Sequence, residues 1–256
     1  MDGIHDLSPY ANLRDRDLKD EGILIAEGRL LAARLLASGL EVISVVCSER
    51  MADELRERAG ARCPVRVLDD GAIERLAGFR FHRGVMAAAA RPALLPLGTF
   101  LAENPASRNI VLCPRLTNDG NLGGIIRTSA ALGADCVAVG AQSCDPFSRK
   151  ALKASMGAAF TLPLVMMDEG EDPLPLLKRH GFTVYAATTG ERSVPLHEVR
   201  PAQKRAVVFG NEADGIPDRI LAQCDEIVHV PMHNDTDSLN VGVAAGVVIY
   251  VLFGSR

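Results

Sequence analysis

The fold is decided by one stretch near the end of the chain, Val230-Pro231-Met232-His233-Asn234-Asp235-Thr236-Asp237-Ser238-Leu239-Asn240, which runs directly into the apolar residues 241–253. The segment before Pro231 has the character of a strand, and the apolar segment has the length of a helix. A polar loop between the end of a strand and the start of a helix is where α/β proteins bind ligands. Residues 241–253 carry no charge, so we expect this helix to be buried against a sheet or a second subunit. It is shorter than the roughly 20 apolar residues of a membrane span, so no membrane partner is expected.

The composition is that of a globular protein. At 256 residues, with 48% hydrophobic and 23% charged residues, the chain can form one large domain or two ordinary ones. Residues 1–6 are acidic and lack an apolar core, so no signal peptide is visible and we expect a cytoplasmic protein. The six cysteines contain no Cys-x-x-Cys pair, which argues against a disulfide framework and against a zinc site. No metal is therefore expected.

The net charge of −4 argues against a protein that coats nucleic acid through bulk electrostatics. It does not exclude a local basic face, because phosphate contacts depend on where arginine and lysine lie.

The first 91 residues resemble one compact α/β unit. The hydrophobic pattern predicts strands over residues 23–26, 42–47, 65–68 and 84–90, and helices over 28–38 and 51–59. Residues 92–105 contain three prolines, one glycine and no basic residue, which is typical of a linker with one helical turn. We therefore expect a first domain over 1–91, a linker over 92–105 and a second domain over 106–256.

The second domain alternates strands and helices. We expect strands over 109–113, 136–139, 183–187, 206–209 and 226–230, and helices over 122–132, 148–155, 173–180, 217–223 and 239–253. The strands are continuous apolar runs, as strands buried on both faces are. The fold class is therefore α/β, with a parallel sheet covered by helices.

A glycine-rich turn followed by a helix stands at residues 118–133. Its spacing does not match Gly-x-Gly-x-x-Gly, and no acid closes a following strand, which disfavours a nucleotide-dependent oxidoreductase. Asn121 lies where it could cap the helix. Arg127 lies inside the helix among apolar residues, where it is either a paired structural cation or a catalytic group.

A second motif, Gly210-Asn211-Glu212, directly follows a predicted strand. Gly210 allows close approach of a ligand to the backbone. Glu212 is an acid at the carboxyl end of a parallel strand, a favoured ligand position. It has three interpretations: it holds a loop, it pairs with Arg127, or it contacts the substrate. Asn240 likewise has the alternative role of capping the last helix.

Three motifs in this order, Asn121-x5-Arg127, Gly210-Asn211-Glu212 and Pro231-Met232 with Ser238-Leu239-Asn240, resemble the SpoU (TrmH-like) family of RNA ribose methyltransferases, in the SPOUT class. Residues 145–147 and 153–158 also look like intermediate segments of that family. The likeness covers roughly residues 109–253. The N-terminal unit is similar to the substrate-binding domain that often precedes this catalytic domain, a small ribosomal-protein-like α/β sandwich.

The resemblance implies transfer of a methyl group from S-adenosylmethionine to a ribose 2′-hydroxyl in RNA. It implies a catalytic domain that ends in a deep trefoil knot, and a homodimer formed by the helices over 122–132 and 239–253. The layout with two domains favours ribosomal RNA over transfer RNA. The alternative is a non-catalytic RNA-binding or assembly relative that kept the knotted dimer.

The resemblance also implies roles for particular residues. Arginine is a poor general base, so Arg127 would lower the pKa of the ribose hydroxyl electrostatically. The implied catalytic residues are Arg127, Asn121, Glu212, Ser238 and Asn240. The implied cofactor-binding residues are Thr188, Thr189, Gly190, Gly210, Asn211, Val230, Met232, Ser238 and Leu239.

The RNA would be held through its phosphates, which position it without reading its sequence. The candidate contacts are Arg14, Arg16, Arg80, Arg83, Arg115, Arg149, Lys150 and Lys153.

Overall fold

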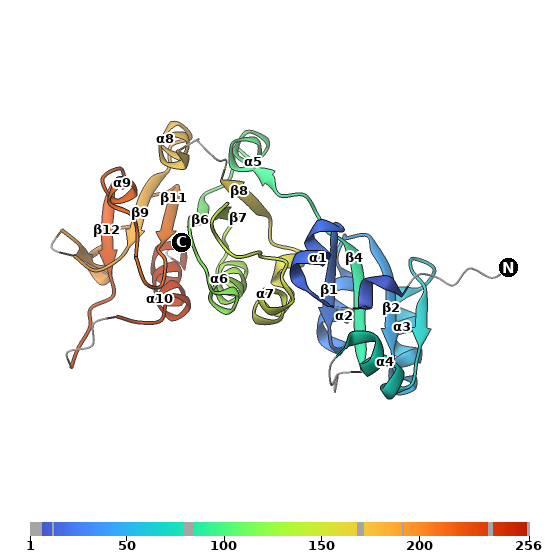
Figure 1. Cartoon of the computed structure of the whole chain (residues 1–256). Coiled ribbons are helices and arrows are strands. Elements are labelled where there is room, and N and C mark those ends of the chain that lie inside the picture. The colour runs from blue at the N-terminus through green and yellow to red at the C-terminus, as the bar shows by residue number, and fades with distance from the viewer. Residues whose placement is uncertain are drawn as a thin grey trace. The chain divides into compact units, whose positions relative to one another are not determined.

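The computed structural model describes residues 7–11, 13–78, 84–167, 172–190, 192–234 and 238–254. The chain forms two compact units (Figure 1). Unit 1 comprises Met1–Ala93 and Phe147–Thr161, and unit 2 comprises Leu94–Pro146 and Leu162–Arg256. The segment 147–161, which the sequence pattern assigned to the second domain, therefore belongs to unit 1.

Unit 1 is built on a four-stranded sheet in the order β1-β4-β2-β3. Strand β4 is antiparallel to both β1 and β2, and β3 is parallel to β2. The strands are β1 (Ile23–Glu27), β2 (Val42–Cys47), β3 (Val65–Val67) and β4 (Val85–Ala90). The helices are α1 (Asp15–Asp20), α2 (Arg29–Ala37), α3 (Ala52–Ala59), α4 (Asp70–Ala77) and α7 (Arg149–Ala154).

One face of this sheet packs around Tyr10, whose hydroxyl lies within 2.7 Å of the Ser44 carbonyl and 3.2 Å of the Ala88 amide. Helix α4, which the sequence analysis did not predict, closes the same core through Ile73. Its cap is Asp69, whose Oδ1 accepts from the amide of Ala72 at 2.8 Å.

Unit 2 is built on an eight-stranded sheet in the order β10-β12-β9-β11-β6-β7-β8-β5, and every neighbouring pair is parallel. The predicted α/β class with a parallel sheet is therefore confirmed. The strands are β5 (Leu95–Pro96), β6 (Asn109–Cys113), β7 (Cys136–Gly140), β8 (Leu164–Met167), β9 (Thr183–Ala187), β10 (Val194–Pro195), β11 (Arg205–Phe209) and β12 (Glu226–His229). Strands β5, β8 and β10 were not predicted.

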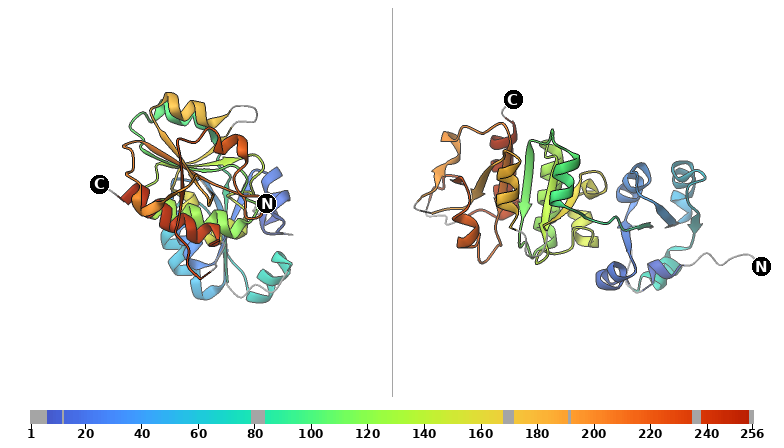
Figure 2. Two further views of the ribbon diagram at one scale, coloured as in Figure 1. Left: turned by 90° about the vertical axis from the view of Figure 1, so that its left-hand side faces the viewer. Right: turned by 90° about the horizontal axis from the view of Figure 1, so that it is seen from above.

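Helices cover both faces of this sheet, with α5 and α8 on one side and α6 and α10 on the other (Figure 2). The first face buries apolar residues of α5 and α8 in one core, against which the partly buried Ile220 and Leu221 of α9 pack. The helices of unit 2 are α5 (Leu97–Glu103), α6 (Asp119–Ala131), α8 (Pro173–Arg179), α9 (Asp218–Leu221) and α10 (Val241–Gly254). None of the helices in the described part of the chain has both the length and the apolar character needed to cross a bilayer.

The segment 92–105, which we expected to be a linker, holds β5 and α5. Leu97, Phe100 and Leu101 are buried at helical spacing in the core of unit 2, and this burial outweighs the turn signal of the prolines. Strand β11 lies between β9 and β6, where the strand order reverses. Ligands bind at such a switch point, outside the carboxyl ends of the strands.

Candidate functional site

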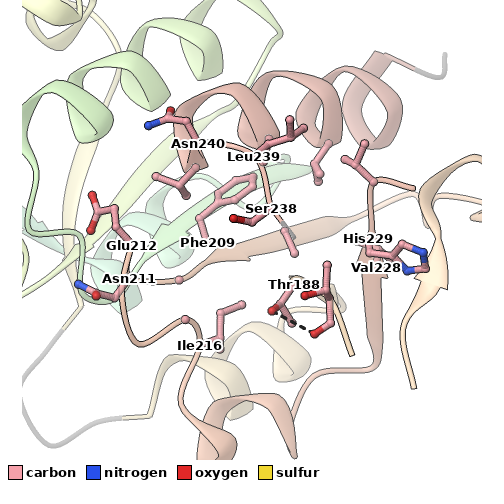
Figure 3. A pocket seen from close by; sticks show the side chains of 18 of the residues that line it. Thr188, Phe209, Asn211, Glu212, Ile216, Val228, His229, Ser238, Leu239 and Asn240 are labelled. Atoms are coloured by element: carbon pink, nitrogen blue, oxygen red, sulfur yellow. Dashed lines mark hydrogen bonds between the residues drawn. The ribbon is translucent and has the colours of Figure 1, made fainter. Parts of the chain in front are cut away.

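A cavity of about 500 Å³ lies at the carboxyl ends of β9, β11 and β12. Its walls are the loops that follow these strands and the first turns of α10. In Figure 3, Asn240, Glu212 and Asn211 stand along one side, and Thr188 and His229 stand on the other. This is the place that the polar loop before α10 predicts for a ligand.

The loop after β11 has a rigid shape. Backbone bonds join Asn211 and Gly215 in both directions, at 2.9 and 3.0 Å. A side chain at Gly210 would place its Cβ 2.5 Å from the carbonyl carbon of Gly215, so this position requires glycine. The Asn211 Oδ1 accepts from the amides of Ala213 at 2.9 Å and Asp214 at 3.1 Å. The loop is therefore held by its own backbone and by one asparagine.

Side-chain contacts of Asn211 and Asp214 tie this loop to the segment between β6 and α6. The Nδ2 of Asn211 donates to the carbonyl of Arg115 at 3.0 Å. The Arg115 guanidinium also forms an ion pair with Asp214 at 2.9 Å. Arg115, a predicted phosphate contact, thus has a carboxylate partner already.

Helix α6 begins at a different asparagine from the one expected. The Oδ1 of Asn118 accepts from the amides of Gly120 at 2.8 Å and Asn121 at 3.2 Å, so Asn118 is the N-cap. The prediction that Asn121 caps the helix is therefore wrong. Because Asn118 provides the cap, the side chain of Asn121 is available for other contacts.

Side-chain amides connect the three sequence motifs in one chain of hydrogen bonds. The Nδ2 of Asn121 donates to Oε1 of Glu212 at 2.8 Å, and the Nδ2 of Asn240 donates to Oδ1 of Asn121 at 3.0 Å. The Oδ1 of Asn240 accepts from the amide of Gly242 at 2.9 Å, so Asn240 also stabilises the start of α10. Segments that lie more than 90 residues apart in sequence thus meet at one edge of the cavity.

Glu212 is held by donors on both of its oxygens. Its Oε2 lies 3.5 Å from the amide and 3.4 Å from the hydroxyl of Thr117. Burial acts to raise the pKa of Glu212, but the bonds from Asn121 and from the backbone of Thr117 and Asn118 outweigh it, and the pKa is lowered. These contacts hold the Glu212 carboxylate between the loop after β11 and the start of α6.

Arg127 lies six residues after Asn121 on α6, and its side chain is exposed. A six-residue step turns a helix by about 240°, so the two side chains leave α6 in different directions. Arg127 is not among the residues that line the cavity, and no contact with Glu212 is found in the described part of the chain. The structure therefore does not pair Arg127 with Glu212 within one subunit.

Eight of the nine residues predicted to bind the cofactor line the cavity, and Gly190 does not. Of the predicted catalytic residues, Glu212, Ser238 and Asn240 line it, whereas Asn121 reaches it through its hydrogen bonds. The sequence analysis missed the apolar wall of the cavity, which is formed by Ala187, Phe209, Ile216, Val228, Val241, Ala244 and Val248. It also assigned no role to Thr117 or Asn118, although an asparagine directly before an acid such as Asp119 is a typical helix start.

The predicted RNA contacts fall into distinct groups. Arg14, Lys150 and Lys153 are exposed. Arg16, also exposed, lies 4.0 Å from Asp20. Arg149 is largely buried and forms ion pairs with Glu27 at 2.6 Å and with Asp15 at 3.5 Å, so two carboxylates already neutralise its charge. Arg80 and Arg83 lie outside the described residues.

The cavity combines an apolar wall with a polar rim. Its volume falls within the range of small-molecule sites, roughly 300–1,000 Å³. A ligand that joins a flat ring to hydrogen-bonding groups matches an apolar wall beside a polar rim. The residues present therefore fit a nucleoside-containing cofactor.

Known proteins are similar to this chain in both sequence and fold. Residues 108–250 match the model of the SpoU rRNA Methylase family. A tRNA/rRNA methyltransferase of Mycobacterium tuberculosis is 32% identical over 90% of this chain and 80% of its own length. A 23S rRNA (guanosine-2′-O-)-methyltransferase of Acinetobacter baylyi is 32% identical over 70% of this chain and 73% of its own length.

Solved structures show the same fold at lower identity. The SpoU methyltransferase AviRb from Streptomyces viridochromogenes, in complex with the cofactor AdoMet, superimposes with a TM-score of 0.82 at 20% identity, over 100% of this chain and 99% of that chain. The AdoMet-bound rRNA methyltransferase from Sinorhizobium meliloti has a TM-score of 0.78 at 23% identity, over 97% and 92% of the two chains. Together, the family match, the sequence relatives and the shared fold show that this chain belongs to the SpoU rRNA methylase family.

Proposed function

We propose that this chain transfers a methyl group from S-adenosylmethionine to a ribose 2′-hydroxyl of ribosomal RNA. The observation that carries the proposal is the chain of hydrogen bonds from Asn240 through Asn121 to Glu212, which assembles the family's three motifs beside one cavity. Family membership supplies the reaction class, and two relatives named as 23S rRNA 2′-O-methyltransferases favour the ribose of ribosomal RNA.

The cofactor site is the cavity at the ends of β9, β11 and β12. We expect the apolar side chains of Phe209, Ile216 and Val228 to contact the adenine ring, and the backbone around Val230 and Met232 to bind its edge. The bound cofactor supplies an electrophilic methyl group on a sulfonium. Glu212 and Asn240 keep the loops around it in place.

Arg127 is the proposed catalytic cation. Its exposed position on α6 means that the substrate, or a second subunit, must approach this face of the helix. A guanidinium beside the ribose lowers the pKa of the 2′-hydroxyl by stabilising the oxyanion that develops as the proton leaves. Arginine itself stays protonated, so a phosphate of the RNA accepts the proton.

A homodimer through α6 and α10 explains the apolar surface of α10. Val243, Val247 and Tyr250 are 55%, 39% and 68% exposed and recur at helical spacing on one side of the helix. The trefoil knot that we propose for the C-terminal segment belongs to the same arrangement. In this dimer, Arg127 would be brought to the substrate by the packing of the two α6 helices.

Unit 1 is the proposed RNA-binding domain. Its exposed Arg14, Lys150 and Lys153 are the strongest candidates for phosphate contacts, because no described acid neutralises them. Arg149 is better explained as the ion pair that fixes the segment 147–161 to β1.

The decisive experiment is a methylation assay with purified protein, tritium-labelled S-adenosylmethionine, and ribosomal and transfer RNA prepared from cells that lack the gene. We expect label in ribosomal RNA at a site that resists alkaline cleavage, since a 2′-O-methyl group blocks attack on the adjacent phosphate. Label in transfer RNA alone would contradict the preference for ribosomal RNA. Absence of label in both would contradict the enzyme activity.

A further inference from the structure

A second cleft in unit 2 lies at the opposite end of the sheet from the cofactor cavity. It has a volume of about 1140 Å³ and is lined by the starts of β6 and β11, the loop 199–203 and the last turns of α6 and α10. Strand β11 runs from Arg205 in this cleft to Phe209 in the cofactor cavity. At about 3.3 Å per residue, this strand separates the two sites by roughly 13 Å.

Three arginines from three separate segments meet in this cleft. They are Arg108, just before β6, Arg200 in the loop before β11, and Arg205 at the start of β11. The described lining contains no aspartate or glutamate, although the whole chain has a net charge of −4. Gathering like charges is unfavourable unless an anion binds among them.

The wall of the cleft is rigid. Arg205 is 9% exposed; its Nε donates to Oδ1 of Asn109 at 2.8 Å, and its guanidinium lies over the ring of Phe253, 5.9 Å from the centroid. Asn109 in turn donates from Nδ2 to the carbonyl of Gly133 at 2.8 Å. Burial lowers the pKa of Arg205, and the nearby charge of Arg108 acts in the same direction.

The other two arginines are free to take a ligand. The side chains of Arg108 and Arg200 are exposed, and neither has an ion-pair or hydrogen-bond partner among the described residues. Asp135 reaches the start of β6, where its carboxylate accepts hydrogen bonds from the backbone amides of Arg108 at 2.6 Å and Asn109 at 2.8 Å. The cleft is therefore lined by two exposed arginines without a described partner, Arg108 and Arg200, and by the buried Arg205.

We propose that this cleft binds a backbone phosphate of the RNA substrate, so that unit 2 holds the RNA at a point distant from the reacting ribose. The fork of donors on a guanidinium matches the oxygens of a phosphate. Such a contact positions the RNA without reading its sequence. This inference rests on the proposed function, because it takes RNA to be the substrate.

The test measures RNA binding as a function of salt for the full-length protein. The probe is a fluorescein-labelled RNA stem-loop of arbitrary sequence, and binding is followed by fluorescence anisotropy between low and physiological salt. The variants are Arg108→Ala, Arg200→Ala and the double variant. The matched control is Arg179→Ala, which removes an exposed arginine from α8 in the same unit.

Each cleft variant should reduce the slope of log affinity against log salt by about 0.7 to 0.9, the value for one lost phosphate contact. The double variant should bind RNA on the order of tenfold more weakly at physiological salt, with unchanged affinity for S-adenosylmethionine. The control should keep the wild-type slope. Equal slopes for the wild type and the double variant would contradict the proposed phosphate site in the cleft without contradicting the proposed function.

Two further outcomes are informative. If the wild-type protein binds S-adenosylmethionine but no RNA at any salt concentration, both the proposed function and the proposed phosphate site would be contradicted. A second experiment measures ADP binding by calorimetry. If the double variant loses ADP binding but binds RNA as the wild type does, the cleft binds a free nucleotide, which would contradict the proposed RNA phosphate site. Light scattering on each variant measures the oligomeric state. A loss of the proposed dimer with unchanged RNA binding would show that the cleft belongs to a subunit interface and not to an RNA phosphate site.

Discussion

The Nδ2 of Asn121 lies 2.8 Å from Oε1 of Glu212, although 91 residues separate them in sequence. This bond joins the first turn of α6 to the loop after β11. Asn240 continues it from the start of α10. The three motifs of the sequence are therefore parts of one structural unit rather than three independent contacts with a ligand.

Replacing Asn121 with aspartate should disrupt this unit. The change removes the donor to Glu212 and sets two carboxylates against each other, which costs about 1–2 kcal/mol at a partly exposed site. We expect roughly tenfold weaker binding of S-adenosylmethionine by calorimetry. Asn118→Asp is the matched control, because in its described contacts the Asn118 side chain accepts hydrogen bonds through Oδ1, and aspartate caps helices equally well. Equal losses in both variants would contradict the importance of the Asn121–Glu212 bond.

The stability contributed by Glu212 should depend on pH in a defined direction. Its pKa is lowered in the folded protein, so its contribution is present above the unfolded value of about 4.3 and is lost as the pH falls through the folded pKa. We expect Glu212→Gln to lower the melting temperature at pH 7, and the difference from the wild type to shrink as the pH falls below the unfolded value. The group is exposed, so the difference should stay below about 1 kcal/mol. A difference in melting temperature between the two proteins that grows as the pH falls would contradict the predicted direction.

The sequence predicts the parallel sheet and most of the cavity rim because both leave local signals. Continuous apolar strands indicate burial on two faces, and polar residues just after them mark the ligand edge. The apolar wall leaves no such signal, because Phe209 and Val228 look like any other core residues in a strand. The segment 147–161 contacts unit 1 through residues far away in sequence, among them the ion pairs of Arg149 with Glu27 and Asp15, and no local pattern contains such contacts.

Arg127 should be required for catalysis and dispensable for cofactor binding. Arg127→Ala should lose almost all methyl transfer while binding S-adenosylmethionine as the wild type does, because the side chain lies outside the cavity. Arg127→Lys keeps the positive charge and should retain measurable activity. Methylation assays and calorimetry on the same preparations separate the two effects. Wild-type activity in Arg127→Ala would remove this residue from the mechanism.

The core of unit 1 should be sensitive to the loss of one hydroxyl. The Tyr10 hydroxyl is fully buried and bonds to Ser44 and Ala88, and burial raises the pKa of Tyr10. Tyr10→Phe leaves the amide of Ala88 without its partner, which should destabilise the unit by about 1–2 kcal/mol in denaturant unfolding. Tyr250→Phe is the control, because its hydroxyl bonds to no described residue and phenylalanine keeps the ring that the proposed dimer would cover. Equal stabilities of the two variants would contradict this account of the core.

The exposed side of α10 should determine the oligomeric state. Val243 is 55% exposed in a helix without a charged residue, and Val247 and Tyr250 extend the same surface. A charge placed there would be desolvated by a second subunit, so Val243→Glu should give a monomer by light scattering while the wild type is a dimer. Because Arg127 does not line the cavity of its own subunit, the monomer should bind S-adenosylmethionine and still fail to methylate RNA. Leu95→Glu is the control, since Leu95 is 45% exposed on β5, at the edge of the sheet. A dimer that survives Val243→Glu with full activity would place the subunit contact elsewhere and would require Arg127 to reach the ribose within one chain.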